Sequence, residues 1–269
     1  MTKAHNLAVD KLSAGYNEKT IIKALSVNIT PGKITSIVGA NACGKSTLLK
    51  SISRLLVPSK GKVLLDGKSV HHIPTRALAC TLGLLPQSPI APEGITVGDL
   101  VSRGRHPHHG LISRWSNKDD QAIAQALEAT KTTDLIDREV DELSGGQRQR
   151  VWIAMALAQE TDILLLDEPT TFLDVTHQIE VLDLLIDLNL SHGVTILMVL
   201  HDLNLAARYS DYLLAIIEGR VHAHGTPKEV LTQSNVQHVF GLNNHIIIDP
   251  VSNTPMMIPI GRHNTHKKI

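Results

Sequence analysis

Short, almost wholly apolar runs alternate with amphipathic segments along the chain. Such runs predict strands of an α/β sheet, and they fall at residues 33–38, 163–167, 194–200 and 212–217. Strands that are apolar on both faces are typical of a largely parallel, buried sheet. Residues 7–30 and 62–67 alternate apolar and polar positions instead, and Asp66-Gly67 marks a turn. We therefore expect an antiparallel side sheet beside a mixed, largely parallel core sheet.

A helical pattern dominates residues 88–142. Its first part is rich in Pro, Gly and His, and a helix is expected near residues 119–131. Beyond residue 167, apolar residues recur at helical spacing, and Gly193 ends that segment. The recurring residues are Val175, Ile179, Leu182 and Ile186. The pattern therefore predicts an inserted helical subdomain and a long helix that packs on the sheet.

No internal repeat or low-complexity linker divides the chain, so we expect one compact unit with two lobes. Thr226 and Glu229 form a capping box for a short helix through Leu231, and residues 246–248 are a candidate strand. The predicted organisation has four parts. These are the first part of the core at 1–87, the helical subdomain at 88–142, the second part of the core at 143–241, and a C-terminal extension at 242–269.

Composition excludes several classes of protein. A chain of 269 residues with 42% hydrophobic content can bury a core unaided. Lys plus Arg and Asp plus Glu both number 26, so no basic field favours a nucleic-acid partner. The apolar runs fall far short of the roughly 20 residues that a membrane-spanning helix needs, and the first residues lack a secretory signal. Together with only two cysteines, Cys43 and Cys80, these features predict a protein of the cytosol.

The sequence GANACGKST, at residues 39–47, follows the first core strand and fits the phosphate-loop pattern. We expect the backbone amides of this loop and the start of the next helix to bind the phosphates of ATP. Lys45 adds a mobile charge, and the Ser46 hydroxyl is expected to ligate Mg²⁺. A plain glycine-rich turn is the alternative, which Lys-Ser-Thr after the second glycine disfavours. The predicted ATP-binding residues are Gly39, Ala40, Asn41, Ala42, Cys43, Gly44, Lys45, Ser46 and Thr47.

Two acids end the strand at residues 163–167. Asp167 follows four apolar residues, where a carboxylate is costly unless a cation lies nearby, so we expect it to hold Mg²⁺ through water. Glu168 is the candidate general base that polarises the attacking water. In isolation, Asp-Glu-Pro would be taken for a polar turn, and its position relative to the phosphate loop favours the catalytic interpretation.

The sequence LSGGQ is the most specific motif of the chain. It comprises Leu143, Ser144, Gly145, Gly146 and Gln147, and it opens a helix at about Gln147. This motif separates ABC-type ATPases from other P-loop enzymes, and the chain resembles that family from about residue 7 to residue 242. The resemblance implies a P-loop NTPase fold, ATP and Mg²⁺ as cofactors, and ATP hydrolysis. It also implies that LSGGQ faces the phosphate loop of a second copy, so that two chains are needed for complete sites.

The same resemblance assigns further residues. His201, after the strand at 194–200, resembles the switch histidine that contacts the γ-phosphate, and Asp202 is expected to cap the next helix. Gln87 resembles the Q-loop glutamine, which reaches Mg²⁺ and links the core to the helical subdomain. Asp174 matches the D-loop aspartate. Tyr16 matches the aromatic residue that stacks on adenine, with an ordinary edge-strand tyrosine as the alternative.

Two longer segments narrow the subfamily. RGRHPH at 103–108 and EPTTFLDVTHQIEVLDLL at 168–185 are similar to ATP-binding subunits of bacterial importers for iron chelates, chiefly ferric siderophores. The implied partners are a second ATPase subunit, two membrane permease subunits at the cytoplasmic face of the membrane and, indirectly, a substrate-binding protein. Importers of heme or cobalamin, exporters and soluble ABC proteins acting on DNA or the ribosome are the alternatives. Long coiled coils, twin modules and basic surfaces, typical of the soluble class, are missing from this sequence.

Some features depart from the family pattern or invite another function. Ala40 and Ala42 stand where Pro and Gly are common, and the loss of Gly at position 42 affects the loop geometry. Cys43 is expected to act through its backbone amide, and its alkylation should block nucleotide binding. The 15 histidines, in clusters such as 71–72, 106–109 and 245–266, suggest a metal sensor, but no acid or cysteine spacing supports one.

Overall fold

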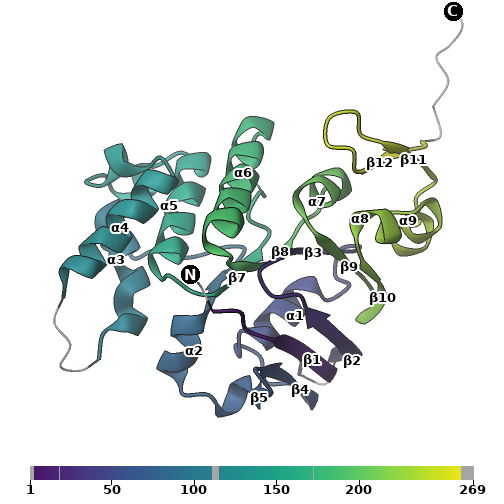
Figure 1. Cartoon of the computed structure of the whole chain (residues 1–269), viewed down its shortest axis with the longest axis horizontal. Helices are drawn as coiled ribbons and strands as arrows, with labels where there is room; N and C mark the ends of the chain where they lie inside the picture. The colour runs from purple at the N-terminus through teal and green to yellow at the C-terminus, as the bar shows by residue number, and fades with distance from the viewer. Residues whose placement is uncertain (1–2, 18, 111–114, 172, 262–269) are drawn as a thin grey trace, which may run out of the picture.

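The computed structural model describes residues 3–17, 19–110, 115–171 and 173–261 (Figure 1). Its centre is a sheet of six strands in the order β10-β9-β3-β8-β7-β6. Five strands are parallel, and β10 pairs antiparallel at one edge. The strands are β3 (Ile34–Val38), β6 (Leu82–Leu85), β7 (Ile163–Asp167), β8 (Thr195–Val199), β9 (Tyr212–Ile217) and β10 (Arg220–Gly225). The predicted core sheet is confirmed.

A second, antiparallel sheet lies beside the core, as the alternating pattern predicts. Its order is β2-β1-β4-β5, formed by β1 (Leu7–Tyr16), β2 (Lys19–Ile29), β4 (Lys60–Leu65) and β5 (Lys68–Ser69). Helix α1 (Lys45–Ile52) contacts both β1 of this sheet and β7 of the core sheet. The side sheet therefore covers the helix that follows the phosphate loop.

The remaining helices cover the core sheet or build the inserted subdomain. After α2 (Thr75–Thr81), the insert holds α3 (Val97–Ser102), the 3₁₀ segment η2 (Arg103–His108) and α4 (Asn117–Ala129), which pack with α5 (Gly145–Ala158). Then come α6 (Val175–His192), α7 (Leu203–Tyr209), α8 (Pro227–Val230) and α9 (Gln233–Phe240). A hairpin of β11 (Asn244–Ile248) and β12 (Pro255–Pro259) packs on α7. Within the described ranges, none of the helices combines the length and apolarity needed to cross a membrane.

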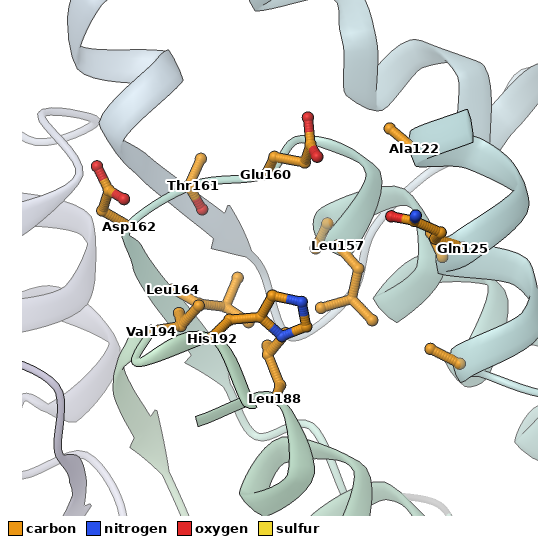
Figure 2. Close-up of a pocket in the computed structure, with 13 residues that line it drawn as sticks. Ala122, Gln125, Leu157, Glu160, Thr161, Asp162, Leu164, Leu188, His192 and Val194 are labelled. Atoms are coloured by element: carbon orange, nitrogen blue, oxygen red, sulfur yellow. The ribbon is translucent and has the colours of Figure 1, made fainter. Parts of the chain in front are cut away.

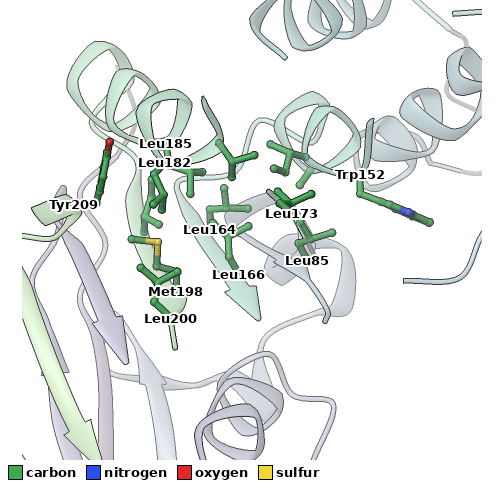
Figure 3. Close-up of a cluster of buried hydrophobic side chains, with 14 of the residues drawn as sticks. Leu85, Trp152, Leu164, Leu166, Leu173, Leu182, Leu185, Met198, Leu200 and Tyr209 are labelled. Atoms are coloured by element: carbon green, nitrogen blue, oxygen red, sulfur yellow. The ribbon is translucent and has the colours of Figure 1, made fainter. Parts of the chain in front are cut away.

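The two faces of the core sheet pack against different layers. On β7, Leu164 and Leu166 join a cluster with residues of α5 and α6, including Trp152 and Leu182 (Figure 3). The alternate residues of the same strand point to the opposite face, where α1 and the side sheet pack. Since both faces are buried, the strand carries no polar residue before Asp167. This packing explains why the core strands are continuous apolar runs rather than alternating ones.

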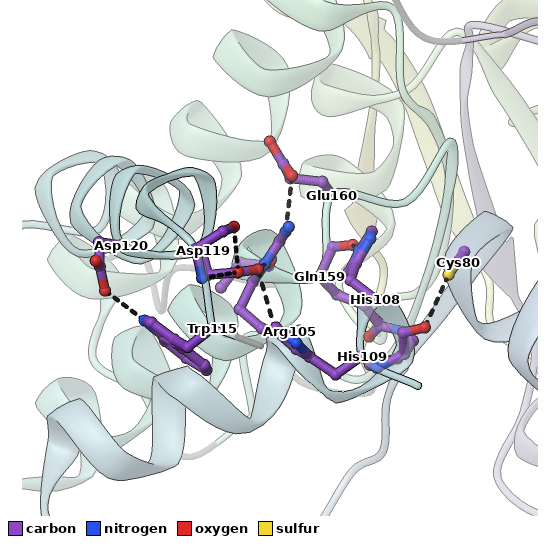
Figure 4. Close-up of polar contacts among 12 residues, drawn as sticks. Cys80, Arg105, His108, His109, Trp115, Asp119, Asp120, Gln159 and Glu160 are labelled. Carbon is purple, nitrogen blue, oxygen red and sulfur yellow. Dashed lines mark hydrogen bonds and ion pairs between the residues drawn. The ribbon is translucent and has the colours of Figure 1, made fainter. Parts of the chain in front are cut away.

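In the segment RGRHPH, residues 103–108, Gly104 and Arg105 are buried in the helical part. Arg105 is 4% exposed, and its Nε donates to Asp119 Oδ1 at 3.0 Å (Figure 4). Its guanidinium also donates to the Ala158 carbonyl and to Glu160 Oε2, both at 2.7 Å. Hydrogen bonds from Ser116 and then Arg105 hold the pKa of Asp119 far below its ordinary value. Arg105 thus ties the start of α4 to the end of α5.

Candidate active site

The phosphate loop connects β3 to α1 through two glycines that the packing requires. A Cβ on Gly39 would lie 2.4 Å from the Ile216 carbonyl oxygen, and one on Gly44 would lie 2.7 Å from Ile22 Cδ1. Ala42 has φ 59°, in the left-handed region, which costs a residue with a Cβ about 1–2 kcal/mol. The loop therefore keeps its curled course although alanine replaces the glycine common in the family.

Lys45 and Ser46 begin α1 and point their polar atoms toward the loop and β7. Lys45 Nζ donates to the Gly39 and Ala40 carbonyl oxygens at 2.9 and 3.0 Å. Ser46 Oγ donates to Asp167 Oδ1 at 3.0 Å. Cys43 is buried, and burial raises the pKa of its thiol. The thiol packs in the hydrophobic cluster between α1 and the side sheet.

At the end of β7, Asp167 and Glu168 occupy different environments. Asp167 is 5% exposed, and burial raises the pKa of its carboxyl, an effect that the Ser46 hydrogen bond opposes. Glu168 has φ 56°, a left-handed conformation that non-glycine residues adopt mainly where the surroundings enforce it. This turn directs the Glu168 carboxylate away from the strand and toward the loop that follows β8.

Three side chains converge on the Glu168 carboxylate. His201 Nε2 lies 2.6 Å from Oε1, Gln87 Nε2 donates to Oε2 at 2.5 Å, and Thr171 Oγ1 donates to Oε2 at 3.1 Å. His201 follows β8 and Gln87 follows β6, so the carboxyl ends of neighbouring parallel strands bring these residues together. The structure therefore brings Glu168, His201 and Gln87, three of the residues predicted from the sequence, into one hydrogen-bonded group.

The phosphate loop and this group share one cleft of about 480 Å³. Its lining includes Lys19 and Ile21 of β2, which sequence reasoning missed. Tyr16 pairs with Lys19 across the β1–β2 hairpin, and its ring lies 5.9 Å from Lys50 Nζ. Tyr16 is 42% exposed and is not among the residues that line the cleft.

The signature and the D-loop residue lie outside this cleft. Ser144 caps α5: its Oγ accepts from the Gln147 amide at 3.3 Å, and its own amide donates to Gln147 Oε1 at 3.1 Å. The helix begins at Gly145 rather than at about Gln147 as expected, because this capping box fixes the first turn. Asp174 caps α6 by accepting from the His177 amide. Neither Ser144 nor Asp174 lines the cleft of its own chain.

Comparison with known proteins identifies the family. The family model described as "ABC transporter" matches residues 22–171. The chain belongs to the ABC transporter family. It is 54% identical to the probable siderophore transport system ATP-binding protein YusV of Bacillus subtilis, over 95% of this chain and 93% of that protein. It is 50% identical to the ferric enterobactin transport ATP-binding protein FepC of Escherichia coli, over 94% of this chain and 93% of that protein.

Solved structures agree with this family. One similar structure is a chain of an ABC transporter assigned to the metal-chelate type, in an inward-facing conformation. The match has a TM-score of 0.82 and 31% identity, and it covers 97% of this chain and 98% of that chain. The ABC transporter cassette MJ0796, solved as a dimer, has a TM-score of 0.73 and 27% identity, covering 82% and 98%. The chain is thus an ABC-type ATPase with the P-loop NTPase fold, and its family binds ATP.

Several histidines of this ABC ATPase make local structural contacts. His108 Nε2 lies 2.7 Å from the Gln159 carbonyl oxygen, and the His222 and His238 rings stack with centroids 4.7 Å apart. No group of three or more His, Cys, Asp or Glu side chains suited to a metal ion occurs among the described residues. His263 and His266 lie outside those residues. The metal-sensor alternative gains no support from the part of the chain that is described.

A second cavity, of about 340 Å³, lies at the opposite end of β7, between α4, α5 and α6 (Figure 2). Small and aliphatic side chains such as Ala126, Leu157 and Leu188 form most of its lining. Its two acids are already paired: Glu160 with Arg105, and Asp162 with His5 Nε2 at 3.0 Å. The phosphate loop, Glu168 and the switch residues expected for ATP hydrolysis line the other cleft.

Proposed function

We propose that this chain is the ATP-hydrolysing subunit of an importer for iron chelates, most specifically ferric siderophores. The observation that carries the cargo assignment is the identity of about half of all residues with two siderophore-type ATP-binding proteins, over more than nine-tenths of each chain. A cobalamin import protein of Halobacterium salinarum shares only 38% over 60% of its length. The similarity therefore favours an iron chelate over cobalamin.

Hydrolysis is proposed to require two copies. The cleft of one chain holds the phosphate loop and Glu168, whereas Ser144 of the signature lies outside it. The amides at the start of α5 would bind the γ-phosphate of an ATP seated on the partner's loop, because a helix N-terminus favours an anion. ATP would thus hold the two subunits together, and its hydrolysis would release them.

Within each site, Glu168 is proposed as the general base. It takes a proton from water as the water oxygen attacks the γ-phosphorus, and ADP leaves with the electron pair of the broken bond. His201 Nε2 lies 2.6 Å from Glu168 Oε1, and Gln87 Nε2 lies 2.5 Å from Glu168 Oε2. These two contacts orient the carboxylate toward the position proposed for the attacking water. Lys45 at the loop neutralises phosphate charge. Tyr16, at the edge of the cleft, is proposed to stack on the adenine.

The residues at the end of β7 fit a hard divalent cation. Ser46 Oγ and Asp167 Oδ1 are hydrogen-bonded beside the phosphate loop. Burial raises the pKa of the Asp167 carboxyl, and a bound cation would stabilise the charged carboxylate in place of the lost water. We propose that Ser46, Gln87 and, through water, Asp167 hold Mg²⁺. When bound, the ion neutralises charge on the β- and γ-phosphates.

Membrane permease subunits are proposed to dock beside the Q-loop. A groove of about 250 Å³ lies between the end of α1 and α2, lined by Leu55, Leu78 and Leu84 among others. Leu55 is 67% exposed at this groove; Val57, two residues further on, is 74% exposed, and Ile90, three residues after Gln87, is 91% exposed. Large apolar side chains this exposed are typical of an interaction surface. The chain would then sit at the cytoplasmic face of the membrane.

The test is to purify the chain with its membrane subunits in lipid discs. ATP hydrolysis is measured with binding proteins loaded with a ferric siderophore, heme or cobalamin, and with each binding protein empty. Stimulation by the ferric siderophore alone supports the proposal. Stimulation by heme or cobalamin alone contradicts the cargo, and no hydrolysis by any complex contradicts the transport function.

A further inference from the structure

His177, in the first turn of α6, joins two segments that sequence reasoning treated as separate. Its amide donates to Asp174 Oδ1 at 2.9 Å, and its Nδ1 lies 2.7 Å from the same oxygen. These two contacts from His177 lower the pKa of the Asp174 carboxyl. The carboxylate form of Asp174 accepts both hydrogen bonds, so the imidazole carries its proton on Nδ1.

The other side of the His177 ring faces the signature of the same chain. A Cβ built on Gly146 would lie 3.2 Å from both Cγ and Cδ2 of His177, closer than an ordinary van der Waals contact. The second glycine of LSGGQ therefore leaves just enough space for the ring. Asp174 and Gly146, 28 positions apart in the sequence, are held against one imidazole.

Helices α5 and α6 lie side by side (Figure 1), and two further contacts link α5 to the segment after β7; together with His177 we call these contacts the seam. Gln149 Nε2 donates to the Pro169 carbonyl oxygen at 2.9 Å, and Arg150 lies 3.4 Å from Glu180 Oε2. His177 is the member of the seam nearest the start of both helices. It is also the member that contacts a signature residue and the D-loop residue at once.

We propose that His177 is a positioning residue that sets the signature and the D-loop as one rigid surface for the partner subunit. This inference rests on the proposed function, in which both segments act on the partner's ATP. Since neither segment lines the cleft of its own chain, His177 does not affect how one chain binds nucleotide. It controls how well two ATP-loaded chains fit each other.

The test separates these two steps in a Glu168→Gln background, in which ATP persists. His177→Ala is expected to leave ATP affinity of the dilute, monomeric chain unchanged and to weaken ATP-driven dimerisation about threefold to tenfold, the usual effect of one lost hydrogen bond. His177→Asn should recover most of the loss, because its amide reaches the same carboxylate. His192→Ala, at the far end of the same helix, is the matched control and should change neither quantity.

A double-variant cycle tests the contact with the signature. Gly146→Ala forces the ring to shift, so its effect on dimerisation should shrink when His177 is already alanine. Equal effects of Gly146→Ala in both backgrounds, or His177→Ala dimerising within twofold of its parent, would overturn the inference. A lowered monomer affinity or melting temperature with no rescue by asparagine would show a merely structural role. If the parent chain itself does not dimerise with ATP, the proposed function fails first.

Discussion

Replacing Glu168 by glutamine isolates the role of the carboxylate, because the side chain keeps its size and shape. The carboxylate now accepts hydrogen bonds from Gln87 and Thr171 on Oε2 and contacts His201 on Oε1. Glutamine offers one carbonyl oxygen and one amide group in their place. The carbonyl oxygen of the new glutamine can still accept a hydrogen bond from His201. The side-chain amide of Gln87 can rotate by 180° so that its oxygen accepts a hydrogen bond from the new amide group. The group stays hydrogen-bonded, so the fold and ATP binding should be retained.

The magnitude follows from the chemistry that is lost. A positioned general base contributes about 10²- to 10⁴-fold to a rate, which corresponds to roughly 3 to 5 kcal/mol of barrier. Glutamine cannot take the proton, so kcat should fall by about that factor while ATP affinity changes less than about threefold. The φ of 56° at this position is equally costly for both residues and does not alter the comparison.

The assay measures phosphate release over a range of ATP concentrations, together with ATP binding by equilibrium dialysis. Thr171→Val serves as a control that removes one contact of Glu168 but no base. A variant that keeps more than about a tenth of the parent kcat would refute the general-base role. A loss of ATP affinity larger than the loss of kcat would refute the claim that the residue acts on the water.

Three further predictions follow from the same contacts. Burial raises the pKa of Asp167, so protonation of this carboxyl stabilises the nucleotide-free fold, and that stabilisation is lost as pH rises through the raised pKa. Asp167→Asn should therefore raise the melting temperature at pH 8 and abolish Mg²⁺-dependent hydrolysis. A lower melting temperature of this variant at pH 8 would contradict the reasoning. Lys19→Ala should weaken ATP binding about twofold to fivefold with kcat nearly unchanged. Lys23→Ala, on the same strand but not in the cleft lining, should not weaken it; equal dialysis results for both would exclude a role for Lys19. Arg105→Met should destabilise the chain by about 3–5 kcal/mol in urea unfolding, because the buried Asp119 carboxylate loses its guanidinium partner and keeps the hydrogen bonds from Ser116, and a change below about 1 kcal/mol would show that the pair is not needed.

Much of the core fold could be predicted because its strands are buried on both faces. The run of β7 is apolar at every position before Asp167, β8 is apolar after Thr195, and Gly193 ends α6 in a left-handed conformation. Strand β10 was missed because RVHAHG is an edge strand with a polar, partly exposed pattern. Helix α4 begins two residues earlier than expected, since Ser116 and Asp119 form a capping box that the pattern of apolar residues does not show.

Site residues that belong to contiguous sequence motifs could be predicted from the sequence. Site residues that reach the cleft only through tertiary packing could not. The phosphate loop and the Asp167-Glu168 pair are contiguous motifs, so their residues could be named from the sequence. Lys19 reaches the cleft only because β2 pairs with β1 beside the phosphate loop. The Asp174–His177 pair is an i, i+3 cap that the sequence could have suggested. Its contact with Gly146 arises from the packing of α5 against α6 and has no sequence signal.

The central claim is that one chain supplies two half-sites, which become complete only between two copies. The most direct measurement is the mass and bound ATP of the Glu168→Gln chain by sedimentation in ATP and Mg²⁺, with and without the added change Ser144→Arg. We predict a dimer with two ATP molecules, which becomes a monomer when Ser144 is replaced, although Ser144 does not line the cleft of its own chain. A monomer that retains ATP equally well with either residue at position 144 would contradict the account.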